Sequence, residues 1–476
     1  MEFPFEAEFE PPTLADLKRG LRAVWSWRGL AGLAIAAGLG YGAYRLDRHF
    51  AARAPEGVGT VSVATTPLPA FLFIDGRPRG ETPAAVVLPA GQHALQLSAA
   101  GYTSVRASIE IHAGETTDVA RELWPGHVQV LPVAAPLPGS RVDSTSFEDD
   151  GSIALDVELS SDAHQLWLLD GGGSYRRFGP TAQGSVALTS DRQELAFAGA
   201  RSVDALSFQT RNAVWMTDGS NPPSLLYVLP QDQTTAQFSS VSWAPQARLL
   251  LAVAANPGST GGAQSRLLLL SPDKGLERDI IDLPAAVVDG SFTWSPNGQQ
   301  VAFVARSGSA TSLCLLDLNT GQFRRLADVG GTSDPLPVAE IAWRPDGQVV
   351  FSAEAPGQNA VGLWGFGGTP SAMLYAAAAA GGPVTALSKA LLRGPQVLSD
   401  GTILGFGPAK GGGVALEELG PGGSAEFLDG TGLNQQRFAA RWDVAHRQAL
   451  LVAAASSGSG DPPRLWRLQF VPGDPQ

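Results

Sequence analysis

The sequence predicts an all-β protein whose largest part is a β-propeller, and a recurring phrase of five residues carries that prediction. The phrase reads Val-Ser-Trp-Ala-Pro at 241–245, Phe-Thr-Trp-Ser-Pro at 292–296 and Ile-Ala-Trp-Arg-Pro at 341–345. The central tryptophans are 51 and 49 residues apart. A period in this range indicates repeated structural units arranged in a stack or a ring.

A tight turn and a short apolar strand follow the phrase. Asn297-Gly298 comes before the triplet Val-Ala-Phe at 301–303, and Asp346-Gly347 comes before Val-Val-Phe at 349–351. Asn-Gly and Asp-Gly supply the positive φ angles of a two-residue hairpin turn. Each phrase is therefore expected to end the first strand of a hairpin.

A third strand is predicted in every copy, and an obvious fourth strand in four copies. The third strand is read at 166–170, 313–317 and 362–364, for example, and a fourth at 323–326. Four strands in a unit of about 50 residues are the layout of a propeller blade.

Aligning the chain on the third position of the phrase extends the series to seven copies, with gaps of 41 to 55 residues. We therefore predict a seven-bladed propeller over residues 126–472. The first strands are marked by Phe147, Leu188, Trp243, Trp294, Trp343, Val397 and Trp442.

One copy also carries a family resemblance. Residues 294–303 read Trp-Ser-Pro-Asn-Gly-Gln-Gln-Val-Ala-Phe. This resembles the repeat of TolB-like, WD-type propellers, which runs Trp-Ser-Pro-Asp-Gly, two variable residues and an aliphatic-Ala-Phe triplet. Propellers of that family typically have six blades, and the copy at Val397 is rich in glycine and weak. Six blades is therefore the alternative to seven.

Ring closure bears on the number of blades. Only 34 residues follow Trp442, which leaves the last blade one strand short. Residues 127–133 form an alternating strand, just before the first blade, that belongs to no blade of its own. We predict that this strand completes the last blade and closes the ring, which leaves few sheet edges exposed.

Residues 59–124 are predicted to form a separate small domain of antiparallel strands. Val61 and Val63 alternate with polar neighbours, and so do Leu95 and Leu97. Alternation of this kind is typical of half-buried antiparallel strands, which Gly and Pro turns join here.

The turns of this segment occur in a recognisable order. An Asp75-Gly76 turn, a Thr82-Pro83 step, a Pro-Ala-Gly turn at 89–91 and a closing Gly101-Tyr102 follow one another. This order resembles the PEGA domain, although the four residues that name that family are replaced by Glu-Thr-Pro-Ala at 81–84. The resemblance implies that residues 59–124 form a small surface-exposed β-sandwich of envelope proteins, with no chemistry of its own.

The N-terminal region predicts a membrane anchor. Residues 29–44 contain no charge, and flanking Arg side chains and aromatic residues suit the membrane interfaces, so 21–46 is predicted as one transmembrane helix. A cytoplasmic tail at 1–20 precedes it and a linker at 47–58 follows. A cleaved signal peptide and a buried soluble helix are the competing interpretations.

Flanking charge and size favour one orientation. Four basic residues precede the span and three follow it, which weakly favours a cytoplasmic N-terminus. More than 400 residues then lie on the other side. We expect a single-pass protein of the bacterial cell membrane, with the bulk of the chain extracytoplasmic.

Charge narrows the range of partners. Residues 1–53 carry 7 basic and 6 acidic side chains, so the remainder carries 26 basic and 39 acidic ones, a net charge of −13. A surface of that sign argues against nucleic acid as the main ligand. We expect an envelope protein or a glycan as the partner, and contact with the membrane through the N-terminal helix.

No pattern of reactive residues stands out. The chain has no Gly-x-Ser-x-Gly elbow, and its glycine runs at 171–173 and 411–413 lack the context of a phosphate loop. Asp149-Asp150-Gly151 is better explained as a turn than as a calcium loop. Cys314, the single cysteine, is expected to be a buried apolar residue. Metal-ligand spacing is absent among the six histidines, which are His49, His93, His112, His127, His164 and His446.

We therefore assign no catalytic, cofactor-binding or metal-ligating residue, and we expect no cofactor. We predict a non-enzymatic protein whose propeller binds or scaffolds a partner. Two alternatives come from other classes. One is a transmembrane sensor or assembly factor that uses the Phe- and Glu-rich tail at 3–12, a segment that also reads as a solvated disordered tail. The other is a propeller enzyme with acidic or histidine side chains in its central channel.

Overall fold

A computed structural model describes residues 57–473 except for short segments, and this part of the chain contains strands and no helix. The all-β prediction is therefore confirmed for it. The described chain forms two compact units: residues up to Leu95 together with Ser108–Ala120, and Gln96–Ala107 together with the residues from Arg121 onward. The segments left out are 68, 148–150, 161–162, 183–185, 189–193, 203–209, 219–222, 231–235, 246–247, 257–263, 284, 289–290, 309, 332–339, 355–371, 390–391, 410–412, 421–424, 434–437 and 454–463.

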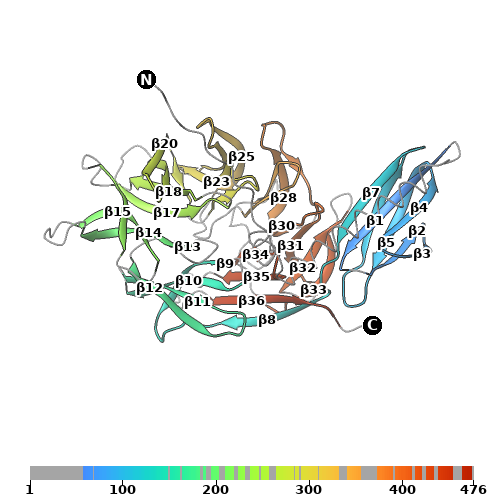
Figure 1. Ribbon diagram of the computed structural model, residues 1–476, viewed down its shortest axis with the longest axis horizontal. Helices are drawn as coiled ribbons and strands as arrows, with labels where there is room; N and C mark the ends of the chain where they lie inside the picture. The colour runs from blue at the N-terminus through green and yellow to red at the C-terminus, as the bar shows by residue number, and fades with distance from the viewer. Residues whose placement is uncertain are drawn as a thin grey trace, which may run out of the picture. The chain divides into compact units, whose positions relative to one another are not determined.

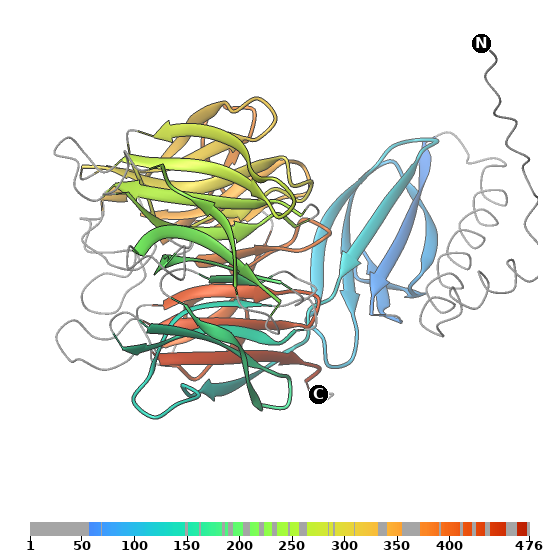
Figure 2. The ribbon, with the colours of Figure 1, turned by 60° about the vertical axis from the view of Figure 1, so that its left-hand side comes forward.

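The first seven strands form two sheets, drawn in blue in Figure 2. Their orders are β4-β1-β7 and β3-β2-β5-β6. Val61 and Val63 on β1 and Leu95 and Leu97 on β5 are buried, which confirms the predicted alternation. The bounds are β1 (Val58–Thr66), β2 (Phe71–Ile74), β3 (Arg77–Glu81), β4 (Ala84–Pro89), β5 (Gly91–Ser98), β6 (Val105–Ile111) and β7 (Thr116–Glu122).

The predicted Asp-Gly turn joins β2 to β3. Asp75 and Gly76 have φ angles of 52° and 71°, the positive values that a two-residue hairpin turn requires. The Asp75 carboxylate accepts a hydrogen bond from the Ala94 N–H at 2.9 Å and contacts the His93 ring at 2.7 Å. This turn is therefore fixed to the neighbouring strand β5.

The remaining strands form seven further sheets, which follow one another in chain order around a ring (Figure 1). The first four sheets contain β9 (Arg141–Phe147), β10 (Ile153–Ser160), β11 (Ala163–Leu169) and β12 (Tyr175–Ala182); β13 (Val186–Leu188), β14 (Leu195–Ser202), β15 (Thr210–Thr217) and β16 (Ser224–Val228); β17 (Gln237–Trp243), β18 (Leu250–Asn256), β19 (Gln264–Ser271) and β20 (Gly275–Leu283); β21 (Ala286–Val287), β22 (Thr293–Trp294), β23 (Gln300–Ser307), β24 (Ala310–Asp317) and β25 (Phe323–Gly331). The last three contain β26 (Ile341–Trp343), β27 (Gln348–Glu354), β28 (Ala372–Ala378) and β29 (Thr385–Ala386); β30 (Arg393–Val397), β31 (Ile403–Pro408), β32 (Val414–Leu419) and β33 (Ala425–Gly430); β34 (Phe438–Asp443), β35 (Gln448–Ala453), β36 (Arg464–Val471) and β8 (His127–Val133).

All seven marker residues lie on the first strand of a hairpin, as predicted. Three of the tryptophans also connect neighbouring sheets through the indole N–H. Trp294 donates to Ser242 Oγ at 3.0 Å, Trp343 to the Thr293 carbonyl at 3.1 Å and Trp442 to the Gly394 carbonyl at 2.9 Å. Each acceptor lies on the strand that carries the marker residue of the preceding sheet, so the repeated tryptophan both packs and links the repeats.

The predicted ring closure is also confirmed. Strand β8 pairs antiparallel with β36, from His127 opposite Val471 to Val133 opposite Leu465. The first strand after the sandwich thus completes the sheet that the end of the chain begins. A sheet built from both ends of the ring closes it without leaving β36 as a free edge.

Neighbouring sheets pack face to face, which buries the middle strands on both sides. Residues Val301 to Ala305 on β23 form an unbroken buried run. Leu251 and Leu267 of one sheet pack in the same apolar cluster as Phe303 of the next. The core is therefore a series of layers between sheets.

Several expectations fall on residues that the structure does not describe, among them the tail at 1–20. The third strand predicted at 362–364 lies in one of these segments, and β28 occupies the third position of that sheet. The transmembrane helix predicted at 21–46 also lies outside the described residues. Within the described part of the chain, no helix has the length and apolar character needed to cross a membrane.

Candidate functional site

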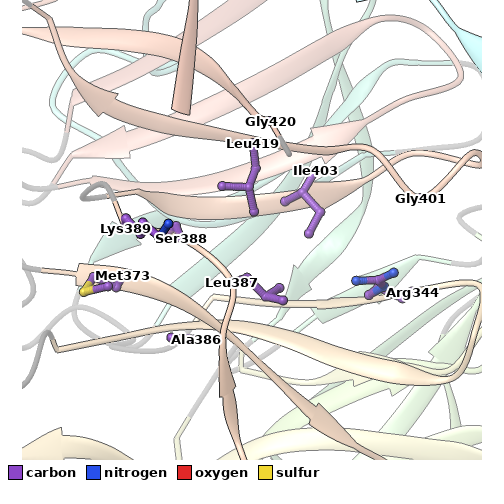
Figure 3. Close-up of a pocket in the computed structure, with 10 residues that line it drawn as sticks. All are labelled: Arg344, Met373, Ala386, Leu387, Ser388, Lys389, Gly401, Ile403, Leu419 and Gly420. Atoms are coloured by element: carbon purple, nitrogen blue, oxygen red, sulfur yellow. The ribbon is translucent and has the colours of Figure 1, made fainter. Parts of the chain in front are cut away.

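A groove opens between the β26–β29 sheet and the β30–β33 sheet (Figure 3). Its volume is about 600 Å³, within the range of ligand-binding pockets. Its walls come from both sheets and from the loops that follow their strands. It is lined by Arg344, Met373, Ala386, Leu387, Ser388, Lys389, Gly401, Ile403, Leu419 and Gly420.

The groove exists because the fourth strand of one sheet is very short. Strand β29 has two residues, both exposed, whereas the fourth strand β25 of the preceding sheet has nine. An apolar cluster between the two sheets contains buried Leu374 and Ile403, with Leu387 and Leu419 partly buried beside it. The short strand therefore leaves the outer part of an inter-sheet core accessible.

Basic side chains flank the apolar surface. In Figure 3, Lys389 and Arg344 lie on opposite sides of Leu387. Arg344 Nε lies 3.3 Å from the Asp346 carboxylate, and the Arg344 side chain is about one-third exposed. Lys389 is exposed. Both groups are cationic at neutral pH.

One wall is fixed by hydrogen bonds to β28. The Leu374 N–H donates to Ser388 Oγ at 3.0 Å, and the Leu387 N–H donates to the Leu374 carbonyl at 2.8 Å. Ser388 is almost fully buried. The segment that carries Lys389 is thus held against the sheet although it is not part of a strand.

The lining combines apolar surface with a few polar groups. The ten described lining residues provide aliphatic surface, the thioether of Met373, the hydroxyl of Ser388 and the two cations. The groove can bind a ligand by apolar contact and charge.

A buried ionic cluster, which we call the clamp, lies at the inner strands of the last three sheets. It consists of Glu340, Arg393 and the groups that surround them. The Glu340 and Arg393 side chains are 5% and 2% exposed, and Arg393 Nε lies 3.3 Å from Glu340 Oε2. The Glu340 carboxylate also accepts hydrogen bonds from the Ala440 N–H at 3.0 Å, from the Gly394 N–H, and from Ser352 Oγ at 3.3 Å.

These donors satisfy the Glu340 carboxylate on every side. They come from the β26–β29 sheet, the β30–β33 sheet and β34, so one anion joins three sheets. A buried carboxylate with this many donors is stabilised as a structural ion. The clamp therefore holds the inner strands of these three sheets together.

A second polar cluster connects the closing sheet to the β9–β12 sheet. The side-chain amide of Gln448, which is fully buried, donates to the Gly151 carbonyl at 2.6 Å and accepts from Arg467 Nε at 2.7 Å. Arg467 in turn donates to the Asp170 carbonyl at 3.3 Å. This cluster, like the clamp, joins neighbouring sheets.

The glycine run at 171–173 forms a turn, and the lone cysteine is buried in a strand. The run at 171–173 lies in the turn between β11 and β12, where the Gly173 N–H donates to the Asp170 carbonyl at 3.2 Å. Cys314 is buried on β24, and burial raises the pKa of its thiol to about 12. Asp149, Asp150 and residues 411–412 lie outside the described chain.

Three of the histidines contact a single carboxylate each. His93 contacts Asp75 at 2.7 Å, His446 contacts Asp443 at 2.8 Å and His164 contacts Asp156 at 3.1 Å. No group of three or more metal-ligating side chains forms among the described residues. His49 lies outside them.

Sequence reasoning did not find the groove. Its lining extends from Arg344 to Gly420 and contains no motif. The only local signal is the Gly-Gly-Pro run at 381–383, which shortens the fourth strand because proline lacks the N–H that a sheet needs.

Solved structures with similar folds include enzymes and other proteins. An oligogalacturonate lyase in complex with manganese is 13% identical with a TM-score of 0.49, and the match covers 72% of this chain and 93% of the lyase. TolB from Acinetobacter baumannii is 16% identical (TM-score 0.31, coverage 67% and 79%). The β-propeller domain of the Trilobed protease from Pyrococcus furiosus is 10% identical (TM-score 0.40, coverage 69% and 95%). At these scores none of their activities transfers to this chain.

Comparison by sequence identifies the small domain alone. No curated protein matches the chain significantly. Residues 58–126 match the family model of the PEGA domain, which confirms the resemblance found at 59–124.

Proposed function

We propose that this chain is a non-enzymatic, single-pass protein of the bacterial cell membrane, whose extracytoplasmic propeller binds a protein or glycan partner. The propeller has seven blades in this proposal, one for each of the seven sheets and with β8 as the closing strand. Residues 21–46 form the anchor, and the PEGA domain links it to the propeller.

The groove is the observation that carries the binding function. It combines an accessible aliphatic surface with two cations, Arg344 and Lys389, on walls from two sheets. Pockets with apolar walls and a few polar groups are the usual form of a binding site. The clamp supports this function because it ties together the two sheets that carry the walls, and a preorganised site loses less entropy on binding.

Photocrosslinking at the groove tests this function. Leu419, partly buried on the wall, is replaced by p-benzoylphenylalanine in the full chain, and cells are irradiated. The matched control carries the same group in place of Leu225, which is 40% exposed on β16 in a different sheet. We expect a discrete adduct from the Leu419 position and none of that mass from the Leu225 position. Equal adducts at both positions, or none at either, would refute the proposal.

The lone cysteine allows a clean test of the location. Cys314 is buried and its pKa is about 12, so the native thiol stays protonated and unreactive. A Leu276→Cys variant places a second thiol at a position that is 38% exposed. We expect a membrane-impermeant maleimide to label this variant, but not the unaltered chain, in intact spheroplasts. Labelling that requires lysis would place the propeller in the cytoplasm and contradict the proposal.

A further inference from the structure

We propose that the groove binds an extended, acidic segment of a partner protein, in which carboxylates flank apolar side chains. This inference rests on the proposed binding function and names the chemistry of the partner. It is carried by the charge of the lining, by the shape of its apolar surface and by the way its walls are held.

The charge of the groove is opposite to that of the chain. The whole chain carries a formal net charge of −12, whereas the ten lining residues that the structure describes carry two cations and no carboxylate. Asp346 neutralises part of the Arg344 charge. Lys389 is exposed, and no described residue forms an ion pair with it. The groove is therefore a basic site on an acidic protein, which attracts an anionic segment and disfavours a cationic one.

The apolar surface between the two cations is aliphatic. Leu387, Ile403 and Leu419 point into the groove between Lys389 and Arg344 (Figure 3). Aliphatic side chains gain free energy by covering other apolar surface, at about 25 cal/mol per Å². A glycan presents many hydroxyl groups, and each one needs a hydrogen-bond partner when it is buried. The groove offers few such partners, so its surface fits Leu, Val or Ile side chains of a peptide.

The order of these features defines the ligand. A cation, an aliphatic surface and a second cation follow one another along the groove. A peptide with a carboxylate, apolar residues and a second carboxylate matches that order. Because Lys389 follows a segment that Ser388 and Leu387 fix to β28, the backbone that carries one of the two cations is already positioned before binding.

The test combines the photocrosslinker at Leu419 with charge changes on the groove. Lys389→Glu reverses the charge of an exposed side chain and leaves the buried wall intact. The matched control is Lys274→Glu, at a lysine that is 69% exposed in the turn between β19 and β20. We expect Lys389→Glu to reduce the adduct roughly tenfold and Lys274→Glu to leave it unchanged. Lys389→Arg, which keeps the charge, should retain the adduct.

Mass spectrometry of the adduct identifies what occupies the groove. We expect a peptide in which Asp or Glu flanks apolar residues. A glycan adduct, a neutral or basic peptide, or an adduct that survives Lys389→Glu would overturn this inference and leave the binding function standing. If the chain that carries the photocrosslinker at Leu419 and no charge change gives no adduct at all, the binding function itself is overturned, and the inference with it.

Discussion

The clamp and the groove share the β26–β29 sheet and the β30–β33 sheet, although the clamp also reaches β34. The two regions are filled in opposite ways. At the clamp, Glu340 and Arg393 are almost fully buried, and the carboxylate accepts hydrogen bonds from donors on neighbouring strands. At the groove, the same pair of sheets leaves Leu387 and Leu419 partly uncovered and Lys389 exposed. Polar groups are satisfied internally in one region and remain available to a ligand in the other.

This difference separates stability from recognition. A buried ion pair contributes little net free energy but makes the loss of either partner costly, so it enforces one arrangement of the strands. A partly exposed apolar groove contributes little to folding and keeps its surface for binding. If this division is correct, changes at the clamp should unfold the propeller, and changes at the groove should affect binding alone.

The largest effect is expected for Glu340→Gln. The amide keeps the shape of the side chain but leaves Arg393 buried without an anion, and it directs an N–H₂ group toward backbone donors. We expect the free energy of unfolding to fall by about 3–5 kcal/mol, the usual cost of breaking a buried pair. The measurement is urea unfolding of the full chain in detergent, followed by labelling of Cys314, a thiol that is buried in the folded propeller.

Glu277→Gln is the control for that change. Glu277 lies 3.1 Å from Lys274 on the surface, and an exposed pair of this kind contributes less than about 1 kcal/mol. If Glu340→Gln lowers the free energy of unfolding by no more than Glu277→Gln does, the clamp does not stabilise the propeller. The contrast between a stabilising clamp and a binding groove would then fail.

A smaller effect separates the core from the groove wall. Leu374 is fully buried between the two sheets, and Leu419 is partly buried in the same cluster. We expect Leu374→Ala to lower the free energy of unfolding by about 2–5 kcal/mol because it leaves a cavity. Leu419→Ala should lower the free energy of unfolding by only about 1 kcal/mol. With the photocrosslinker placed at a neighbouring groove position such as Met373, the same change should abolish most of the crosslinking. Equal losses of stability would show that the groove wall is ordinary core.

Most of the propeller was predictable because its signals are local and repeated. The phrase that ends in Trp294-Ser295-Pro296 and the turn at Asn297-Gly298 lie within five residues, and the hairpin they predict is present in each of the seven sheets. The closing strand was predictable for a different reason. The last sheet lacked one strand, residues 127–133 had no sheet, and β8 pairs with β36.

The candidate site was not predictable because its members are distant in sequence. Glu340 meets donors at Ser352, Gly394 and Ala440, which are 12, 54 and 100 residues away. Nothing near Glu340 in the sequence indicates these partners, since a lone carboxylate before a strand is normally exposed. The groove depends on the absence of strand residues after Thr385 and Ala386, and a two-residue strand leaves no periodic pattern to detect.

The smallest expected effect concerns Glu417, which lies on β32, the strand that ends in the groove wall at Leu419. Burial raises the pKa of Glu417 above its ordinary value. Between the ordinary and the raised pKa the folded chain binds more protons than the unfolded chain, so the free energy of unfolding falls as pH rises through this window.

Glu417→Gln removes the ionisation. We expect the variant to be slightly more stable than the unaltered chain at neutral pH. At pH values below the ordinary pKa of the carboxyl group, the two chains should be equally stable. Tryptophan fluorescence in urea at the two pH values measures the difference. Glu277→Gln, which loses an attractive partner, should show no gain at neutral pH. If Glu417→Gln gains stability equally at both pH values, the buried charge is not the cause of the gain. Strand β32 would then accommodate a buried carboxylate as well as the clamp accommodates that of Glu340.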